Sequence, residues 1–128
     1  MNTIKETTLA ELVRSFMEYA ASRGIQSFPP MLYGPWWHTF LYEAREKIPE
    51  IAGIIGGFDW DCPNPQNRLF KNFGPTAIYS SFARTQTVDD RLIMNYVRPT
   101  NQLISSCLGI FEKMFSIANQ IPDFFEIP

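Results

Sequence analysis

The fold is decided by residues 100–121, TNQLISSCLGIFEKMFSIANQI, the longest stretch of the chain with a regular apolar repeat. On a helix, with about 100° between successive residues, its apolar side chains cover about half of the circumference. A surface helix that packs on one neighbour usually has an apolar stripe of roughly 100°. The sequence therefore predicts a long helix over residues 100–121 that contacts two neighbours.

The apolar residues of this helix form two parallel rows in which spacings of four and three residues alternate, as at helix–helix contacts. One row is expected to close the core of the chain and the other to meet a second subunit. The alternative is a helix that is buried inside a monomer. The row assigned to a homodimer interface is Leu103, Cys107, Ile110, Met114, Ile117 and Ile121, and the other row is Ile104, Leu108, Phe111, Phe115 and Ala118.

The composition indicates one folded domain, because 45% of the 128 residues are hydrophobic and 15% are aromatic. The two cysteines fit neither a metal-ligand spacing nor a disulfide framework. No charged segment followed by an apolar run opens the chain, and no apolar stretch approaches the length of a membrane span. We therefore expect a soluble, cytoplasmic protein with no membrane association.

Residues that could support catalysis or bind a metal are few. His38 is the only histidine and has no cysteine at ligand spacing. Asp59 and Asp61 form a close carboxylate pair, but a calcium loop needs more ligands and a glycine at its sharp turn. The chain also lacks a nucleophile motif and a phosphate-binding glycine loop. The sequence therefore predicts no catalytic residue, no metal site and no cofactor.

Two helices are predicted in the first half of the chain. Thr8 and Glu11 have the spacing of a capping box, and Gly24 suits the end of the helix that starts there. Pro35 suits the first position of a second helix, which Pro49 ends. Between the helices, the prolines of residues 27–31 predict an extended connector on the surface. The predicted core residues are Leu12, Phe16, Phe40, Leu41, Ala44, Leu69, Phe70 and Leu108.

A short helix and a hairpin are predicted between the second helix and residue 100. Residues 65–73 begin with a proline and are followed by a glycine, which frames a short third helix. Residues 76–83 and 91–97 are rich in β-branched and aromatic residues, which favour antiparallel strands. Residues 84–90 between them are polar and predict a rather long hairpin tip.

The same part of the chain carries the only local excess of positive charge. Residues 65–98 contain five basic and two acidic side chains, although the whole chain has a net charge of −2. Guanidinium groups can pair with guanine edges or phosphates, and asparagine can pair with adenine. The candidate nucleic-acid-binding residues are Asn67, Arg68, Lys71, Arg84 and Arg91.

The order helix, helix, short helix, hairpin, long helix resembles a winged-helix domain with an added C-terminal helix. This resemblance implies an α+β, mostly helical fold. Residues 1–99 would form the winged-helix-like domain, and residues 100–128 a C-terminal helix and tail of the same domain that mediates dimerisation. In that superfamily the third helix commonly enters the DNA major groove and the hairpin contacts phosphates. The resemblance thus implies a DNA-binding, transcription-regulator-like homodimer.

The acidic net charge leaves a second function open, because contacts with phosphates supply most of the nonspecific affinity for DNA. The alternative is an adaptor or inhibitor that keeps a winged-helix-like scaffold and binds a protein partner instead of DNA. Its basic side chains would be scattered or would pair with acidic residues such as Glu43, Glu46 and Glu50. An enzyme is a third class, which the absence of catalytic motifs disfavours.

Overall fold

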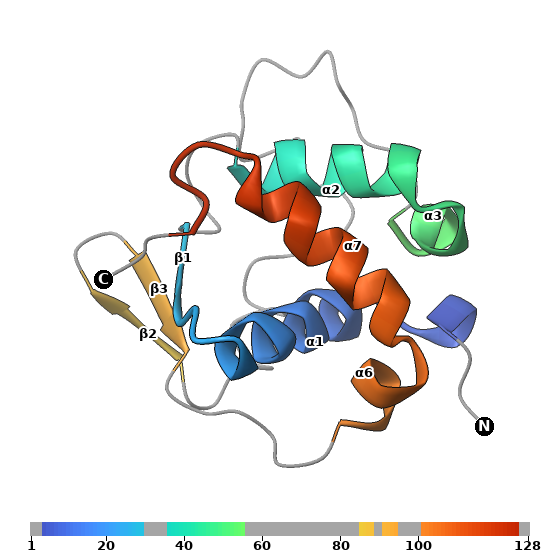
Figure 1. The fold of residues 1–128 in the computed structure, drawn as a ribbon, viewed down its shortest axis with the longest axis horizontal. Coiled ribbons are helices and arrows are strands. Elements are labelled where there is room, and N and C mark those ends of the chain that lie inside the picture. Colours follow the sequence, from blue (N-terminus) through green and yellow to red (C-terminus); the bar gives the residue numbers. More distant parts are fainter. Residues whose placement is uncertain (1–3, 30–35, 56–84, 89–90, 95–100, 126–128) are drawn as a thin grey trace.

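The computed structural model describes residues 4–29, 36–55, 85–88, 91–94 and 101–125 (Figure 1). These residues are mostly helical and include a small antiparallel sheet, so the predicted α+β, mostly helical class is confirmed. The elements are η1 (Ile4–Glu6), α1 (Leu9–Ser22), β1 (Ser27–Phe28), α2 (Trp36–Lys47), α3 (Pro49–Ile55), β2 (Thr85–Val88), β3 (Arg91–Met94), α6 (Gln102–Ser106) and α7 (Leu108–Asn119).

Helix α1 begins and ends where local sequence signals predict. The Thr8 hydroxyl accepts a hydrogen bond of 3.1 Å from the backbone N–H of Glu11, as in a capping box. At the other end, Gly24 has a φ of +92°, which a residue without a Cβ adopts easily. The backbone N–H of Ile25 then donates to the carbonyl of Ala20 at 2.9 Å. This bond closes the helix as a Schellman motif.

Strand β1 corrects the prediction of a surface connector over residues 27–31. β1 pairs antiparallel with β3, and β3 also pairs with β2, so the strand order is β1-β3-β2. The Phe28 side chain is fully buried and joins the core. The predicted extended path is confirmed for Ser27 and Phe28, but this part is a paired strand and not only a connector. Proline prevents only the donation of a backbone hydrogen bond, and Pro29 stands just after the paired residues.

A hairpin is present, but its first strand is formed by residues that were predicted to be its tip. Val88 pairs with Arg91, so only residues 89–90 connect the two strands. Residues 85–88 therefore belong to β2 and not to the tip. Their polarity suggested a loop, although threonine at alternate positions also suits a strand. The predicted strand over residues 76–83 and the predicted third helix lie outside the described residues.

The predicted helix over residues 100–121 is broken into α6 and α7. The break lies at Cys107, whose φ of −127° and ψ of 36° are not helical. Asn101 caps α6 by accepting a hydrogen bond from the backbone N–H of Ile104. The prediction of one continuous helix was wrong. Serine at the end of α6 and glycine near the start of α7 favour the helical state only weakly, so the chain can bend there.

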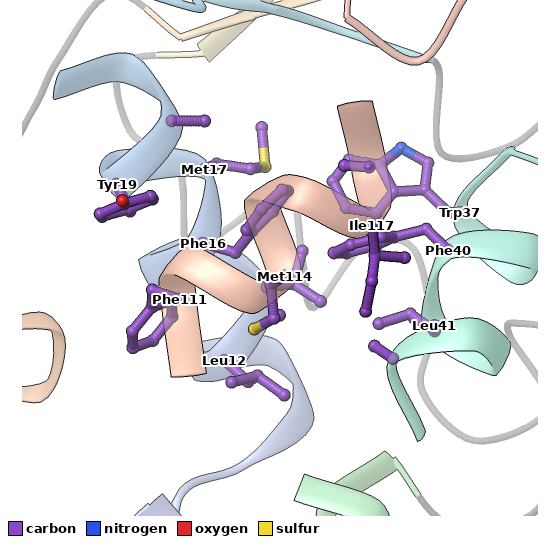
Figure 2. Packing of buried hydrophobic residues seen from close by; sticks show 14 of the residues in the cluster. Leu12, Phe16, Met17, Tyr19, Trp37, Phe40, Leu41, Phe111, Met114 and Ile117 are labelled. Atoms are coloured by element: carbon purple, nitrogen blue, oxygen red, sulfur yellow. The ribbon is translucent and has the colours of Figure 1, made fainter. Parts of the chain in front are cut away.

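The core lies where α7 packs against both α1 and α2 (Figures 1 and 2). Helix α7 thus contacts two neighbours, but both belong to the same chain, as expected of the alternative in which the helix is buried inside a monomer. Five predicted core residues, Leu12, Phe16, Phe40, Leu41 and Ala44, are fully buried.

Leu108 is not in the core, because 47% of its surface is exposed. It is the first residue of α7 and lies at the edge of a buried face formed by Phe111, Met114 and Ala118. The prediction that Leu108 is a core residue was therefore wrong. Leu69 and Phe70 lie outside the described residues.

An aromatic cluster forms the centre of the core. The ring of Phe16 lies 4.6 Å from that of Phe40, measured between centroids. It also lies between 6.3 and 6.5 Å from the rings of Trp37, Phe124 and Phe125. The segment after α7 therefore returns to the core and joins α1 to α2.

Candidate functional site

The described part of the structure includes little of the predicted nucleic-acid-binding set. Asn67, Arg68, Lys71 and Arg84 lie outside it. Arg91 begins β3 and pairs in register with the last residue of β2. The proposal that these five residues form one surface therefore stays a prediction.

The predicted interface row is divided between the core and the surface. Met114 and Ile117 lie in the chain's own core, with exposed fractions of 0% and 7%. The other row also supplies buried residues, Phe111 and Ala118. The remaining members of the interface row are half-buried and pack at the edge of the core: Leu103, Cys107, Ile110 and Ile121.

One side of α7 carries the exposed Leu108 and, two turns later, the half-buried Phe115, which contacts Tyr19 near the end of α1. Leu108 and Phe115 are seven residues apart on α7 and thus share one side of that helix. The Arg23 guanidinium lies 4.8 Å from the centre of the Phe115 ring and 5.8 Å from that of Tyr19. It also donates a hydrogen bond of 2.9 Å to the Tyr19 hydroxyl. We call these four residues the Arg23–Leu108 surface.

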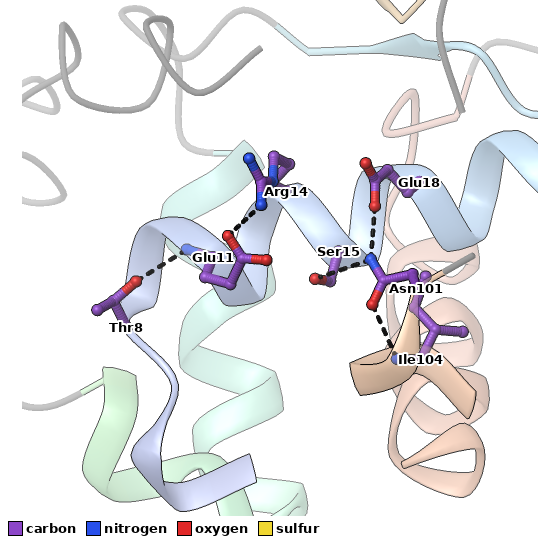
Figure 3. Close-up of polar contacts among 7 residues, drawn as sticks. All are labelled: Thr8, Glu11, Arg14, Ser15, Glu18, Asn101 and Ile104. Carbon is purple, nitrogen blue, oxygen red and sulfur yellow. Dashed lines mark hydrogen bonds and ion pairs between the residues drawn. The ribbon is translucent and has the colours of Figure 1, made fainter. Parts of the chain in front are cut away.

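A buried polar cluster joins α1 to the start of α6 (Figure 3). The Asn101 amide nitrogen donates to the carboxylate of Glu18 and to the Ser15 hydroxyl at 3.4 Å. Its amide oxygen accepts the capping hydrogen bond from Ile104 at 3.1 Å. Glu18 is only 3% exposed. Because a buried carboxylate needs hydrogen bonds, this cluster holds α6 against α1, and we assign it a structural role.

A pocket lies between the C-terminal halves of α2 and α7. Its volume is about 210 Å³. The ammonium group of one lining residue, Lys47, forms an ion pair of 3.1 Å with Glu43 on the same helix. Sequence analysis did not identify this pocket, because its two lysines come from distant parts of the chain. The lining residues are Lys47, Ile48, Lys113, Ser116, Ile117 and Gln120.

The described residues include neither a cluster that could hold a metal ion nor a helix that could cross a membrane. No group of three or more His, Cys, Asp or Glu side chains among them is placed to hold a metal ion. Within the same residues, every helix is too short or too polar to cross a bilayer. Asp59 and Asp61, the carboxylate pair noted in the sequence, lie outside the described part of the chain.

Comparison of the chain with protein-family models, with curated proteins and with solved structures finds no match. Function must therefore be inferred from the residues of this chain and from their arrangement.

Proposed function

We propose that the chain is a DNA-binding protein of the winged-helix type that acts as a homodimer. The observation that carries this proposal is the attachment of the hairpin to the helices. β1, which lies between α1 and α2 in the chain, pairs with β3 of the hairpin. Met94, at the end of β3, is buried in the core. A hairpin that is attached to the helices in this way has a fixed position, and it could therefore act as the wing that contacts phosphates.

The distribution of charge along the chain supports the same function. The segment of residues 65–98 includes the hairpin and has an excess of three positive charges. In the proposal, Arg84 and Arg91 flank the wing, and Arg68 and Lys71 lie on a helix that enters a groove. Contacts between cations and phosphates release counterions, so the affinity must fall as the salt concentration rises.

Titration of labelled duplex DNA with the full chain at two salt concentrations tests the proposal. We expect affinity to fall steeply with salt. Arg84→Ala and Arg91→Ala should each reduce the slope of log affinity against log salt by about one unit, because each removes one phosphate contact. Lys47→Ala, which lies outside the basic segment, should leave the slope unchanged. Absence of salt-dependent binding by the unmodified chain would refute the proposal.

The homodimer in this proposal uses the Arg23–Leu108 surface. An isologous interface brings one surface against its own copy, so it needs groups that complement each other. Glu112 is exposed on α7, about 40° around the helix from Leu108. The surface and its border therefore carry one positive and one negative side chain, Arg23 and Glu112, which can pair across a two-fold axis.

Sedimentation at micromolar concentration tests the dimer. The unmodified chain should sediment as a dimer, and Leu108→Glu should sediment as a monomer because a charge replaces an apolar contact. Glu112→Arg should weaken the dimer, whereas the double variant Arg23→Glu/Glu112→Arg should restore it. Thr39→Arg, which adds a charge at an exposed position on α2, serves as a control. A monomeric unmodified chain would exclude this interface.

A protein-interaction module is the second candidate function. The observation that favours it is Leu108, a large apolar side chain that is 47% exposed on the same side of α7 as the half-buried Phe115. This function predicts ion pairs between acidic residues such as Glu43 and the basic segment of residues 65–98. Glu43 instead pairs with Lys47 on its own helix, so it does not support that part of the hypothesis. A monomer that does not bind DNA would favour this function.

A further inference from the structure

We propose that residues 121–125 form a strap that holds the sheet on the helices, and that release of this strap frees the sheet while the helices stay folded. The strap follows α7 and contains two adjacent phenylalanines, Phe124 and Phe125. Figure 1 shows this segment, in red, turning from the end of α7 toward β1. A short segment after α7 thereby sets the position of the sheet formed by β1, β3 and β2.

The two phenylalanines of the strap contact different parts of the fold. The Phe124 side chain is fully buried. Its ring centroid lies 5.0 Å from that of Trp37 and 5.1 Å from that of Phe40, both on α2. Phe125 is half-buried, and its ring lies 6.2 Å from that of Phe28 on β1 at an angle of 77°. Phe124 thus anchors the strap on the helices, and Phe125 contacts the sheet.

Phe125 joins the sheet to two helices. Its ring lies 5.0 Å from that of Phe115 on α7 and 6.3 Å from that of Phe16 on α1. Aromatic pairs at such separations attract each other when they are stacked or edge to face. Phe28, its partner on β1, is fully buried and pairs in register with Leu92 of β3. The contact with Phe28 therefore acts on β1 and, through the hydrogen-bonded strands, on the whole sheet.

The sheet is small and needs support from the rest of the chain. β1 contributes two residues, and β2 and β3 contribute four each. A two-stranded hairpin is at best marginally stable in water unless a further strand or a helix packs against it. Two side chains of the sheet, Phe28 and Met94, are buried in the core. Loss of the ring that contacts Phe28 should therefore increase the fraction of molecules in which the sheet has left the helices.

The helices, in contrast, share a core that does not include the strap. Leu12 of α1, Leu41 of α2, and Phe111 and Met114 of α7 are fully buried where these helices meet (Figure 2). Burial of such side chains is the main source of stability for packed helices. Loss of the half-buried Phe125 ring leaves these contacts in place. The sheet can therefore open in a step that leaves the helices packed.

The strap does not depend on DNA binding, because it follows from contacts among the described residues. The two can be tested separately in the same chain. If the sheet is the wing, as in the proposed function, DNA binds the attached sheet and at saturation should slow hydrogen exchange of the Met94 amide. Failure of DNA to do so would contradict the wing and not the strap.

Hydrogen exchange of the full chain, followed by NMR, tests the strap. The amide of Met94 donates to the carbonyl of Gln26 at 2.9 Å and reports opening of the sheet, whereas the amide of Phe16 in α1 reports unfolding of the helices. Phe125→Ala should raise the ratio of the Met94 rate to the Phe16 rate about tenfold, since it removes the contact with Phe28. Phe125→Tyr keeps the ring and should leave this ratio within about twofold of the unmodified value.

The matched control is Phe124→Ala, which removes the neighbouring ring that contacts α2 and not β1. It should speed exchange in the helices at least as much as in the sheet, so the ratio should not rise. An equal rise for Phe124→Ala and Phe125→Ala would overturn the proposal. An unchanged ratio for Phe125→Ala would also overturn it, as would an equal rise for Phe125→Tyr.

A second pair of variants leaves both rings in place. Asp123 has a φ of 64°, an angle that aspartate and glycine adopt far more often than β-branched residues do. Asp123→Val should therefore displace the strap and raise the exchange ratio, whereas Asp123→Gly should not. Both variants remove the same carboxylate, so the difference between them measures the effect of the turn. Equal ratios in the two variants would show that the turn does not hold the strap on the sheet.

Discussion

Replacing Phe16 with alanine should lower the free energy of unfolding by about 3–5 kcal/mol, because it removes the central ring of the core. Phe16 is fully buried, and its ring centroid lies within 6.5 Å of those of Trp37, Phe40, Phe124 and Phe125. These rings come from α2 and from the segment after α7. A cavity at Phe16 therefore removes contacts between three parts of the chain at once.

Urea denaturation followed by tryptophan fluorescence measures this effect. Leu108→Ala, a truncation of a side chain that is 47% exposed, is the matched control. At a protein concentration too low for association, it should cost less than about 1 kcal/mol. A loss for Phe16→Ala no larger than that of the control would show that the aromatic cluster does not hold the helices together.

Replacing Asn101 with aspartate should lower the free energy of unfolding by about 2–3 kcal/mol. Aspartate can still accept the capping hydrogen bond from Ile104, so the start of α6 keeps its cap. The amide group that donates to Glu18 is lost, however, and two carboxylates then face each other in a buried place. The expected loss of stability therefore measures the contact between α1 and α6, because the hydrogen bond that caps α6 is kept.

The exchange Glu18→Gln/Asn101→Asp should recover most of this loss. It restores one amide and one carboxylate in the same place, with their positions reversed. Asn119→Asp at the exposed end of α7 should lower the free energy of unfolding by less than about 1 kcal/mol, because its new charge meets only the C-terminal end of that helix. If the double variant is as unstable as Asn101→Asp alone, the contact with Glu18 is not what stabilises α6.

Features that depend on neighbouring residues could be predicted from the sequence. The ends of α1 follow from Thr8 and Gly24, whose effects act within one helical turn. The burial of Leu12 and Phe16 follows from their spacing on that helix. The cap at Asn101 is likewise local.

Features that depend on distant residues could not be predicted. The bend at Cys107 leaves the apolar repeat almost undisturbed, and α6 is held in place by a bond from Asn101 to a residue 83 positions earlier. Leu108, which is exposed, directly follows that bend. The pocket brings Lys47 and Lys113 together across two helices, which no local pattern signals. The predicted third helix over residues 65–73 lies outside the described residues.

The central position of α7 has a consequence for synthesis of the chain, which proceeds from the N-terminus. Residues 108–125 supply the helix between α1 and α2 and the rings that cover Phe16. A nascent chain that has completed the hairpin but not these residues still presents the aromatic side chains of α1 and α2 to solvent. Such uncovered surface promotes aggregation and chaperone binding. Stable folding therefore follows translation of α7, however early α1 and α2 become helical.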